Sequence, residues 1–380
     1  MKYRTMGKLG IQASAFGLGC MRFNGQASGD SVIDENKAIG LIRRAIDGGV
    51  TYLDTAYVYL DKTSEIVLGK ALRDGYREKV TIATKMPKEY VHNRAEMEAL
   101  LAEELKKLQT DHIDFYLMHG INKEKWEYFK SIGAPEFFED MKKAGKIRYK
   151  CFSFHGPYED FEYILNDWDW DMTQIQYNFM DVHNQAGQKG LELAGKKGVP
   201  VVIMEGLLGG RLSKAPDNVQ ALYDAFPVKR SAVEWAFRWL CNHPEVAVVL
   251  SGCNEEKQID ENLRIFDTVE PGIMSEEECK LMENVRAAYL SRTKIGCTGC
   301  RYCMPCPNGV DIPGLFSAWN NVSLYDTDPR WDWNLRQIKE RKAGANQCVA
   351  CGACEAACPQ RLPIIESLQT AWRELKAEET

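Results

Sequence analysis

A short stretch of the sequence decides the fold: LDTAYVY, residues Leu53–Tyr59, in which apolar residues end in an acid and a tyrosine follows five positions later. Two later stretches are built in the same way, VTIATK at Val80–Lys85 and IDFYLMH at Ile113–His119. Runs of this length and composition are typical of buried strands. If the three runs are neighbouring parallel strands, their polar ends meet at one end of a barrel, where such folds carry their chemistry.

The first 274 residues repeat this pattern throughout. Eight candidate strands end near Gly19, Asp54, Lys85, Met118, Ser153, Gln176, Met204 and Ser251. The stretches between them mostly carry the apolar period of helices, as at Met97, Leu101, Leu105 and Leu108. Eight βα units in about 250 residues predict an α/β fold, a (β/α)8 TIM barrel at residues 1–274. A doubly wound sheet is the alternative, but Gly17–Met21 lacks the third glycine of a dinucleotide-binding turn.

Composition limits the classes of function. A chain of 380 residues is long for one domain, and its 45% hydrophobic and 27% charged residues are ordinary for a globular protein. The net charge of −6 gives no basic surface for nucleic acid or an anionic membrane. No apolar secretory core follows Lys2, Arg4 and Lys8, and no apolar run is long enough to span a bilayer. We therefore expect a cytoplasmic protein without a nucleic-acid or membrane partner.

Four residues at the strand ends have complementary chemistry for reducing a carbonyl group. The reaction needs a hydride donor at carbon and a proton donor at oxygen, and Tyr59 is the candidate proton donor. A free phenol has a pKa of about 10, which a nearby ammonium lowers. Lys85 is the candidate ammonium, Asp54 would hold it in place, and His119 would hydrogen-bond the substrate oxygen. The alternative is four unrelated polar residues that end strands, which their complementary roles disfavour.

Several short motifs occur in one order along about 270 residues: Asp54-Thr55-Ala56 with Tyr59, Ser64–Gly69, Ala83-Thr84-Lys85, Tyr116–His119, Gly145–Tyr149, Gln174–Asn178, and Leu250-Ser251-Gly252 with Glu261-Asn262. In these motifs the chain resembles the aldo-keto reductases. The resemblance implies a (β/α)8 barrel that binds NAD(P)H without a Rossmann fold and acts on a small-molecule carbonyl substrate. It also implies a catalytic tetrad of Asp54, Tyr59, Lys85 and His119, with Tyr59 as the general acid.

The same resemblance implies a set of cofactor-binding residues: Gly19, Cys20, Met21, Ser153, Gln174, Met204, Glu205, Leu207, Arg211, Ser251, Gly252, Cys253, Gln258, Glu261 and Asn262. Within this set, Ser153 and Gln174 would bind the nicotinamide amide. Glu205, Leu207 and Arg211 would approach the pyrophosphate from the loop after the seventh strand.

The chain departs from the family pattern at three places. The family usually has asparagine directly after the serine, and here Phe154 and His155 follow Ser153. Met204 stands where many members stack a tyrosine on the nicotinamide ring. NADP-preferring members typically carry a basic residue after the eighth strand and an arginine before the final helix, where this chain has Gly252 and Gln258. Lys257, next to Gln258, is the alternative source of a single positive charge. The sequence therefore does not decide between NADH and NADPH.

Eight of the 13 cysteines form two runs that each end in Cys-Pro: Cys297, Cys300, Cys303 and Cys306, then Cys348, Cys351, Cys354 and Cys358. The second run has the bacterial ferredoxin spacing, in which the fourth cysteine binds the other cluster. Two 4Fe-4S clusters would then exchange Cys306 and Cys358 between the runs. The first run is one residue shorter before its Cys-Pro, so the sequence leaves this exchange open. Zinc is the alternative metal, and disulfides do not suit cysteines at every third position.

Residues 275–380 are predicted to form a second, mostly helical domain. A linker helix is expected at 275–292 with Ser275 as its N-cap, and further helical signals follow at Asp311, at 336–342 and at 364–378. The region resembles the helical ferredoxin domains of respiratory reductases.

The sequence thus predicts an NAD(P)H-dependent oxidoreductase that reduces an aldehyde or ketone to an alcohol and carries two 4Fe-4S clusters for electron transfer or structure. Nicotinamide moves two electrons as hydride and each cluster moves one, so a redox partner protein is one candidate for the cluster electrons. The alternative is a redox-sensing or electron-transfer adaptor built on a barrel without carbonyl turnover.

Overall fold

The computed structural model describes residues 1–23 and 34–376. The chain divides into two compact units, Met1–Gly209 with Val233–Cys279, and Gly210–Ala232 with Lys280–Thr380. The expected division between residues 274 and 275 stays a prediction. Among the helices of the described residues, none has both the length and the apolar character that crossing a bilayer requires.

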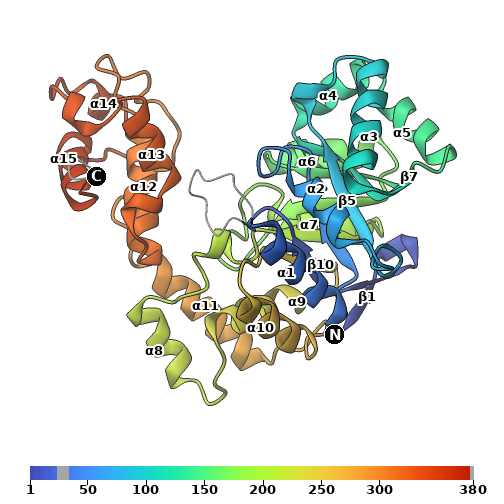
Figure 1. Ribbon diagram of the computed structural model, residues 1–380. Helices are drawn as coiled ribbons and strands as arrows, with labels where there is room; N and C mark the ends of the chain where they lie inside the picture. Colours follow the sequence, from blue (N-terminus) through green and yellow to red (C-terminus); the bar gives the residue numbers. More distant parts are fainter. Residues whose placement is uncertain (24–33, 377–380) are drawn as a thin grey trace. The chain divides into compact units, whose positions relative to one another are not determined.

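The first unit is a closed barrel of eight parallel strands surrounded by helices, which confirms the predicted TIM barrel (Figure 1). Its strands, in barrel order from the one that closes on β9, are β10 (Val246–Ser251), β3 (Phe16–Gly19), β4 (Tyr52–Asp54), β5 (Thr81–Met86), β6 (Ile113–Ile121), β7 (Ile147–Phe154), β8 (Met172–Gln176) and β9 (Val201–Met204). The helices that alternate with them are α1 (Glu35–Asp47), α2 (Ser64–Ala71), α3 (Arg94–Leu108), α4 (Lys123–Ser131), α5 (Ala134–Lys143), α6 (Tyr158–Asp167), α7 (Gly187–Lys196), α9 (Ala232–Cys241) and α10 (Glu256–Phe266).

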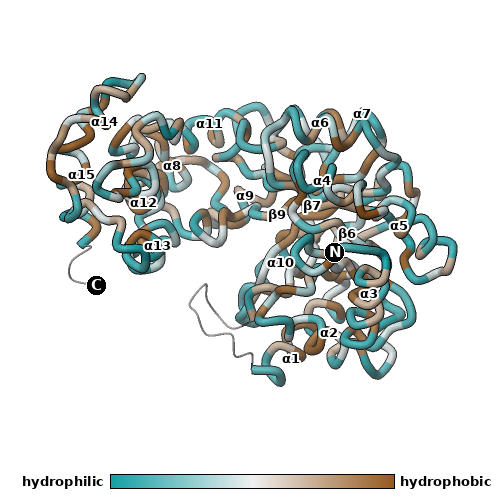
Figure 2. The backbone as a smooth tube through the Cα atoms, turned by 90° about the horizontal axis from the view of Figure 1, so that it is seen from above, coloured by the Kyte–Doolittle hydropathy of each residue, from teal (hydrophilic) through white to brown (hydrophobic). Residues whose placement is uncertain are grey.

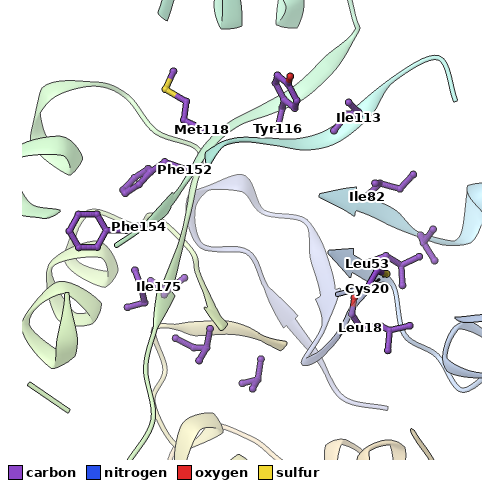
Figure 3. Close-up of a cluster of buried hydrophobic side chains, with 14 of the residues drawn as sticks. Leu18, Cys20, Leu53, Ile82, Ile113, Tyr116, Met118, Phe152, Phe154 and Ile175 are labelled. Carbon is purple, nitrogen blue, oxygen red and sulfur yellow. Dashed lines mark hydrogen bonds between the residues drawn. The ribbon is translucent and has the colours of Figure 1, made fainter. Parts of the chain in front are cut away.

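Strand side chains alternate between two hydrophobic clusters because successive residues point to opposite faces of the sheet. The outer cluster joins strands to helices and includes Leu53, Ile82, Tyr116, Phe152 and Phe154 (Figure 3). The inner cluster contains the strand residues between them: Tyr52, Ala83, Phe115, Leu117, Cys151 and Met172. Figure 2 shows hydrophobic residues along the central strands and hydrophilic residues on the outer helices. The interior of the barrel is therefore packed, and a ligand can be bound only at its ends.

A short N-terminal hairpin that the sequence patterns did not predict closes one end of the barrel. It pairs β1 (Tyr3–Thr5) with β2 (Gln12–Ser14), and Met6 and Ala13 join the inner cluster. The Arg4 guanidinium donates to the carbonyl of Val246, at the start of β10, over 2.6 Å. Because the hairpin covers the N-terminal ends of the strands, the C-terminal ends are the accessible ones.

The second unit is helical and has its own hydrophobic core. Its helices are α8 (Asp217–Ala225), α12 (Ile312–Tyr325), α13 (Trp333–Glu340), the short α14 (Ala353–Ala356) and α15 (Ile364–Glu374), together with most of α11 (Glu276–Leu290). Leu315, Phe316, Leu335 and Leu368 are core residues. The predicted caps are confirmed, because Ser275 Oγ accepts from the amide of Glu278 and Asp311 Oδ1 accepts from the amide of Gly314.

Residues 210–232, which the sequence analysis placed in the barrel, belong to the second unit. Asn218 on α8 donates to the carbonyl of Ala288 on α11 over 3.0 Å, and Arg292 donates to Asn218 over 3.2 Å. The segment that leaves the barrel after β9 is thus bonded to the C-terminal helices before it returns as α9.

Candidate active site and cluster sites

The four tetrad residues gather at the C-terminal ends of β4, β5 and β6. Asp54 is two residues after the inward Tyr52, Lys85 is two residues after the inward Ala83, and His119 is two residues after the inward Leu117. The strand period of two therefore places all three side chains on the inner side of the barrel. Tyr59 lies in the turn after β4, where its ring faces the His119 ring at a centroid distance of 6.0 Å.

Lys85 and Asp54 form a buried ion pair, with Lys85 Nζ 2.7 Å from Asp54 Oδ1 and 2.7 Å from the carbonyl of Thr55. Burial alone would lower the pKa of Lys85, but Asp54 and Tyr59 outweigh it and the pKa is raised. Burial raises the pKa of Asp54, and Lys85 and Gln174 oppose that rise. Lys85 is therefore an ammonium whose position is fixed by two acceptors.

The expectation of a lowered phenol pKa is not met by Tyr59 in this structure. Lys85 Nζ lies 4.9 Å from the centre of the Tyr59 ring and does lower the pKa of the phenol. Burial acts in the opposite direction and is larger, so the net pKa of Tyr59 lies above its usual value. The phenol is consequently neutral and holds its proton throughout the neutral pH range.

His119 is also neutral at ordinary pH. Burial and the charge of Lys85 lower the pKa of this imidazole to about 3. A neutral imidazole beside the phenol can donate one hydrogen bond without adding a second positive charge.

Ser153 and Gln174 lie next to the tetrad, and each has a side-chain atom that is free to form a further hydrogen bond. The amide of Gly120 donates to Ser153 Oγ over 2.7 Å, which leaves the serine hydroxyl hydrogen available. Gln174 Nε2 donates to Asp54 Oδ2 over 3.3 Å, and its buried Oε1 has no hydrogen-bond partner among the described residues. A primary amide such as that of nicotinamide offers a donor to Gln174 and an acceptor to Ser153. These two residues fit the predicted cofactor.

Phe154, which stands in place of the family's asparagine, points away from the site. It belongs to the outer cluster and packs on Phe161 of α6 at a centroid distance of 5.1 Å. His155 is the next polar residue, and its Nδ1 lies 3.1 Å from Gln185 Oε1. Gln185 Nε2 in turn donates to Gln176 Oε1 over 3.0 Å, so His155 ends a chain of amide hydrogen bonds.

The predicted cofactor residues around β3 and β10 differ in how far their polar groups are already used. Gly19 ends β3, Cys20 is fully buried in the outer cluster, and Met21 is exposed. Asn262 on α10 donates to Ser251 Oγ over 3.1 Å and to Cys253 Sγ over 3.2 Å. Gln258 forms the capping box of α10 with Glu255, so its side chain is occupied. Glu261 is half-buried on the same helix.

The residues after β9 separate into two groups. Met204 ends the strand, Glu205 is exposed, and Leu207 packs on the outer cluster. Arg211 belongs to the second unit, where its Nη2 pairs with Asp332 Oδ2 over 3.4 Å. The structure therefore gives Arg211 a partner within the helical unit.

The eight cysteines of the two runs line two cavities of the helical unit. One cavity is lined by Cys297, Cys300, Cys303 and Cys358. The other is lined by Cys306, Cys348, Cys351 and Cys354, and Cys303 lines both cavities. Over residues 1–23 and 34–376, no group of three or more His, Cys, Asp or Glu side chains is placed closely enough to hold a metal ion. The cavities nevertheless group the thiols as the exchanged ferredoxin spacing predicts.

The two cysteine runs also share a backbone pattern. The residues on either side of the second cysteine have positive φ in both runs, at 69° and 64° for Gly299 and Arg301 and at 57° and 79° for Ala350 and Gly352. The third residue after the last cysteine donates to that cysteine's carbonyl in both, over 3.0 Å for Gly309 and 3.1 Å for Arg361. The runs are therefore equivalent loops although the first is one residue shorter.

A model of the aldo/keto reductase family matches residues 15–284, which include the whole barrel described above. The chain belongs to the aldo-keto reductase family. A second family model, the 4Fe-4S dicluster domain, matches residues 296–362 and spans all eight cysteines of the two runs.

Known aldo-keto reductases and related proteins resemble the chain over 75% of its length. The uncharacterized oxidoreductase YqkF of Bacillus subtilis (strain 168) is 24% identical over 314 residues, which cover 75% of this chain and 96% of the relative. The structure of aldo-keto reductase AKR11C1 from Bacillus halodurans, in its holo form, is 27% identical with a TM-score of 0.63 and covers 75% of this chain and 96% of its own. An aldo-keto reductase from Klebsiella pneumoniae solved with NADPH shares the fold at 23% identity and a TM-score of 0.58, covering 75% of this chain and 96% of its own.

Behind the tetrad of this aldo-keto reductase lies a set of hydrogen bonds whose role the sequence analysis missed. Ser64 Oγ at the start of α2 contacts Thr55 Oγ1 and donates to the carbonyl of Cys20, both over 2.8 Å. Glu65 Oε1 accepts from Thr84 Oγ1 over 2.7 Å. Thr55 and Thr84 are the chain neighbours of Asp54 and Lys85. The Ser64-Glu65 motif is visible in the sequence, but the residues that it contacts can be identified only from the folded structure.

Proposed function

We propose that this aldo-keto reductase reduces the carbonyl group of a small molecule to an alcohol, with NAD(P)H as reductant and Tyr59 as the general acid. The observation that carries the proposal is the buried Lys85–Asp54 ion pair, with Lys85 Nζ 4.9 Å from the centre of the Tyr59 ring and the centre of the His119 ring 6.0 Å from it. Tyr57 also has an ammonium on its ring, with Lys107 Nζ 4.0 Å from the ring centre, but Tyr57 packs in the outer cluster.

Each residue has a distinct part in the proposed reaction. Tyr59 keeps its proton at neutral pH and transfers it to the substrate oxygen as negative charge develops there. Lys85 stabilises the phenolate that results, and Asp54 prevents the ammonium from moving or losing its charge. His119, neutral because its pKa is about 3, donates a hydrogen bond to the same oxygen and orients the carbonyl.

The nicotinamide cofactor would be held by residues with free polar atoms beside the tetrad. Gln174 Oε1 would accept from the nicotinamide amide nitrogen, and the Ser153 hydroxyl would donate to its oxygen. When bound, NAD(P)H supplies the hydride that reaches the carbonyl carbon. Met204, two residues after the inward Val202 on β9, would offer a polarisable apolar contact for the ring.

The decisive experiment replaces only the phenol oxygen. We expect Tyr59→Phe to lower kcat for aldehyde or ketone reduction by at least about 100-fold, because it removes the general acid. The Kd for NADPH and NADH should change less than about twofold, since the ring stays in place. Tyr3→Phe, at the opposite end of the barrel, is the matched control and should behave as wild type.

Two outcomes would contradict the proposal. Reduction by Tyr59→Phe at the wild-type rate would remove Tyr59 from the chemistry. Failure of the wild-type protein to reduce a broad panel of carbonyls with either nucleotide would favour the electron-transfer adaptor without carbonyl turnover.

We also propose that residues 275–380 form a ferredoxin-like domain with two 4Fe-4S clusters. Cys297, Cys300, Cys303 and Cys358 would hold one cluster, and Cys306, Cys348, Cys351 and Cys354 the other. The cavities and the shared backbone pattern of the runs support this assignment. Thiolate ligands of this spacing suit iron–sulfur clusters better than paired zinc sites.

A further inference from the structure

Arg22 lies at the C-terminal end of the barrel and crosses the ends of three adjacent strands. It follows β3 by three residues, and β10 separates β3 from β9 in the barrel. The Cβ, Cγ and Cδ atoms of Arg22 lie 3.4–3.5 Å from the position that a Cβ on Gly252, after β10, would occupy. Its Nη2 lies 3.3 Å from the corresponding position on Gly209, after β9. The side chain thus extends over the end of β10 to the β9 loop.

The surroundings of Arg22 hold the side chain in this place. The next residue, Phe23, is buried in the outer cluster and anchors the backbone. Gly252 has no side chain and leaves room for the arginine stem. Gly209 has a φ of 65°, a conformation that other residues rarely adopt. A larger side chain at either glycine would compete with Arg22 for space.

The guanidinium of Arg22 lacks an anionic partner. It is half-buried, yet the described residues give it no hydrogen bond and no ion pair. The carboxylate of Glu205 is close, with Oε2 3.6 Å from the same Cβ position on Gly209, but it forms no salt bridge with Arg22. A half-buried guanidinium that forms no ion pair, at the end of the barrel that holds the tetrad, fits an anionic group of a ligand.

We propose that Arg22 binds a phosphate of the nicotinamide dinucleotide. Its side chain lies over Gly252, one of the predicted cofactor-binding residues after β10. The side-chain oxygen of Gln258, another residue of that set, already accepts from the amides of Asn254 and Glu255. Arg22 brings a cation to these residues from the loop after β3, a strand that is distant in sequence but adjacent in the barrel. This inference rests on the proposed function, because it requires that the protein bind NAD(P)H.

The test measures nucleotide binding directly, by isothermal titration calorimetry on the full-length protein with NADPH and with NADH. Arg22→Met should raise Kd at least about tenfold, as expected for loss of a charge-assisted hydrogen bond. Arg22→Lys should give an intermediate Kd, because it keeps the charge but not the paired donors. Arg73→Met, an exposed arginine at the end of α2, is the matched control and should leave Kd unchanged.

The two nucleotides distinguish which phosphate is bound. An equal rise in Kd for NADPH and NADH assigns Arg22 to the pyrophosphate, and a rise for NADPH alone assigns it to the adenosine 2′-phosphate. If Arg22→Met does not fold, the neutral and polar Arg22→Gln takes its place, and Kd should rise more steeply with salt in the wild type than in Arg22→Gln, which lacks the charge.

Failure of this inference can be told from failure of the proposed function. Wild-type Kd values in Arg22→Met for both nucleotides, or equal salt dependence in wild type and Arg22→Gln, would overturn the role of Arg22. If the wild-type protein binds neither nucleotide, the proposed function itself fails.

Discussion

At the scale of single residues, opposing effects on Tyr59 set its protonation. The ammonium of Lys85 favours the phenolate, whereas burial disfavours it more strongly and raises the pKa. A general acid must be protonated to act, so a raised pKa preserves the acid form in neutral solution. A raised pKa also makes Tyr59 a weaker acid. In the proposed reaction the charge of Lys85 is therefore important, because it stabilises the phenolate that forms during proton transfer.

This balance predicts the pH dependence of carbonyl reduction. The protonated fraction of Tyr59 falls as pH rises through its pKa, which lies above its usual value of 10.0. We therefore expect kcat to be level from about pH 6 to about pH 9 and to fall only at higher pH. No change is expected near pH 6.5, because the pKa of His119 is about 3.

The same pH dependence of kcat should be measured for Lys85→Met. Without the ammonium the pKa of Tyr59 rises further, so kcat should fall about 10²–10⁴-fold and its alkaline decline should shift to higher pH. Lys79→Met, on an exposed lysine, is the control. A decline of wild-type activity near pH 7, or an unchanged rate in Lys85→Met, would contradict this account.

At the scale of elements, the start of α2 holds together the ends of three barrel strands. Ser64 joins Thr55 after β4 to the carbonyl of Cys20 after β3, and Glu65 accepts from Thr84 in β5. Ser64 and Glu65 are fully buried, so water cannot replace these hydrogen bonds. The helix therefore holds Thr55, next to Asp54, and Thr84, next to Lys85, by their hydroxyl groups.

Removing the Ser64 hydroxyl should affect both stability and turnover. Ser64→Ala leaves the Thr55 hydroxyl and the Cys20 carbonyl without this partner, at a cost of about 1–3 kcal/mol in the free energy of unfolding measured with urea. We expect kcat to fall, because Ser64 no longer holds Thr55, the neighbour of Asp54, and the tetrad is displaced. Ser64→Thr, which keeps the hydroxyl, should recover kcat, and the exposed Ser131→Ala should change neither quantity. Unchanged kcat in Ser64→Ala would show that α2 does not position the tetrad.

At the scale of the whole molecule, each unit has its own hydrophobic core and its own proposed chemistry. The helical unit includes residues 210–232, so the chain connects the two units at the β9 loop as well as along α11. In the proposed domain, each run of cysteines either binds its own cluster or gives its last cysteine to the cluster of the other run. The cavities favour exchange, with Cys358 beside the first run and Cys306 beside the second.

The exchange predicts which cysteine substitutions have the same effect. Protein purified without oxygen should contain about eight irons, and each cysteine-to-alanine substitution should remove about four. The EPR signal lost in Cys358→Ala should be the one lost in Cys300→Ala, and that lost in Cys306→Ala should be the one lost in Cys351→Ala. Cys279→Ala, outside both runs, should retain all of the iron. The opposite pairing would overturn the exchange, and zinc in place of iron would overturn the clusters.

The sequence alone predicted the barrel, which the structure confirms, and it named the tetrad and the eight cysteine ligands, which stay predictions. Its apolar runs have the length of strands, and Asp54, Lys85 and His119 stand at their ends with chemistry that residue type fixes. Register follows from the strand period of two, so the inward placement of these side chains was predictable from local pattern.

Only the tertiary structure decided what depends on distance and burial between remote segments. It placed Arg22 over Gly252, tied Ser64 and Glu65 to Thr55 and Thr84, gathered Cys358 with the first run, and assigned residues 210–232 to the helical unit. It also reversed the expected direction of the Tyr59 pKa shift. The physical reason is that residue type fixes which charges are present, whereas desolvation and contact depend on what the folded chain packs around them.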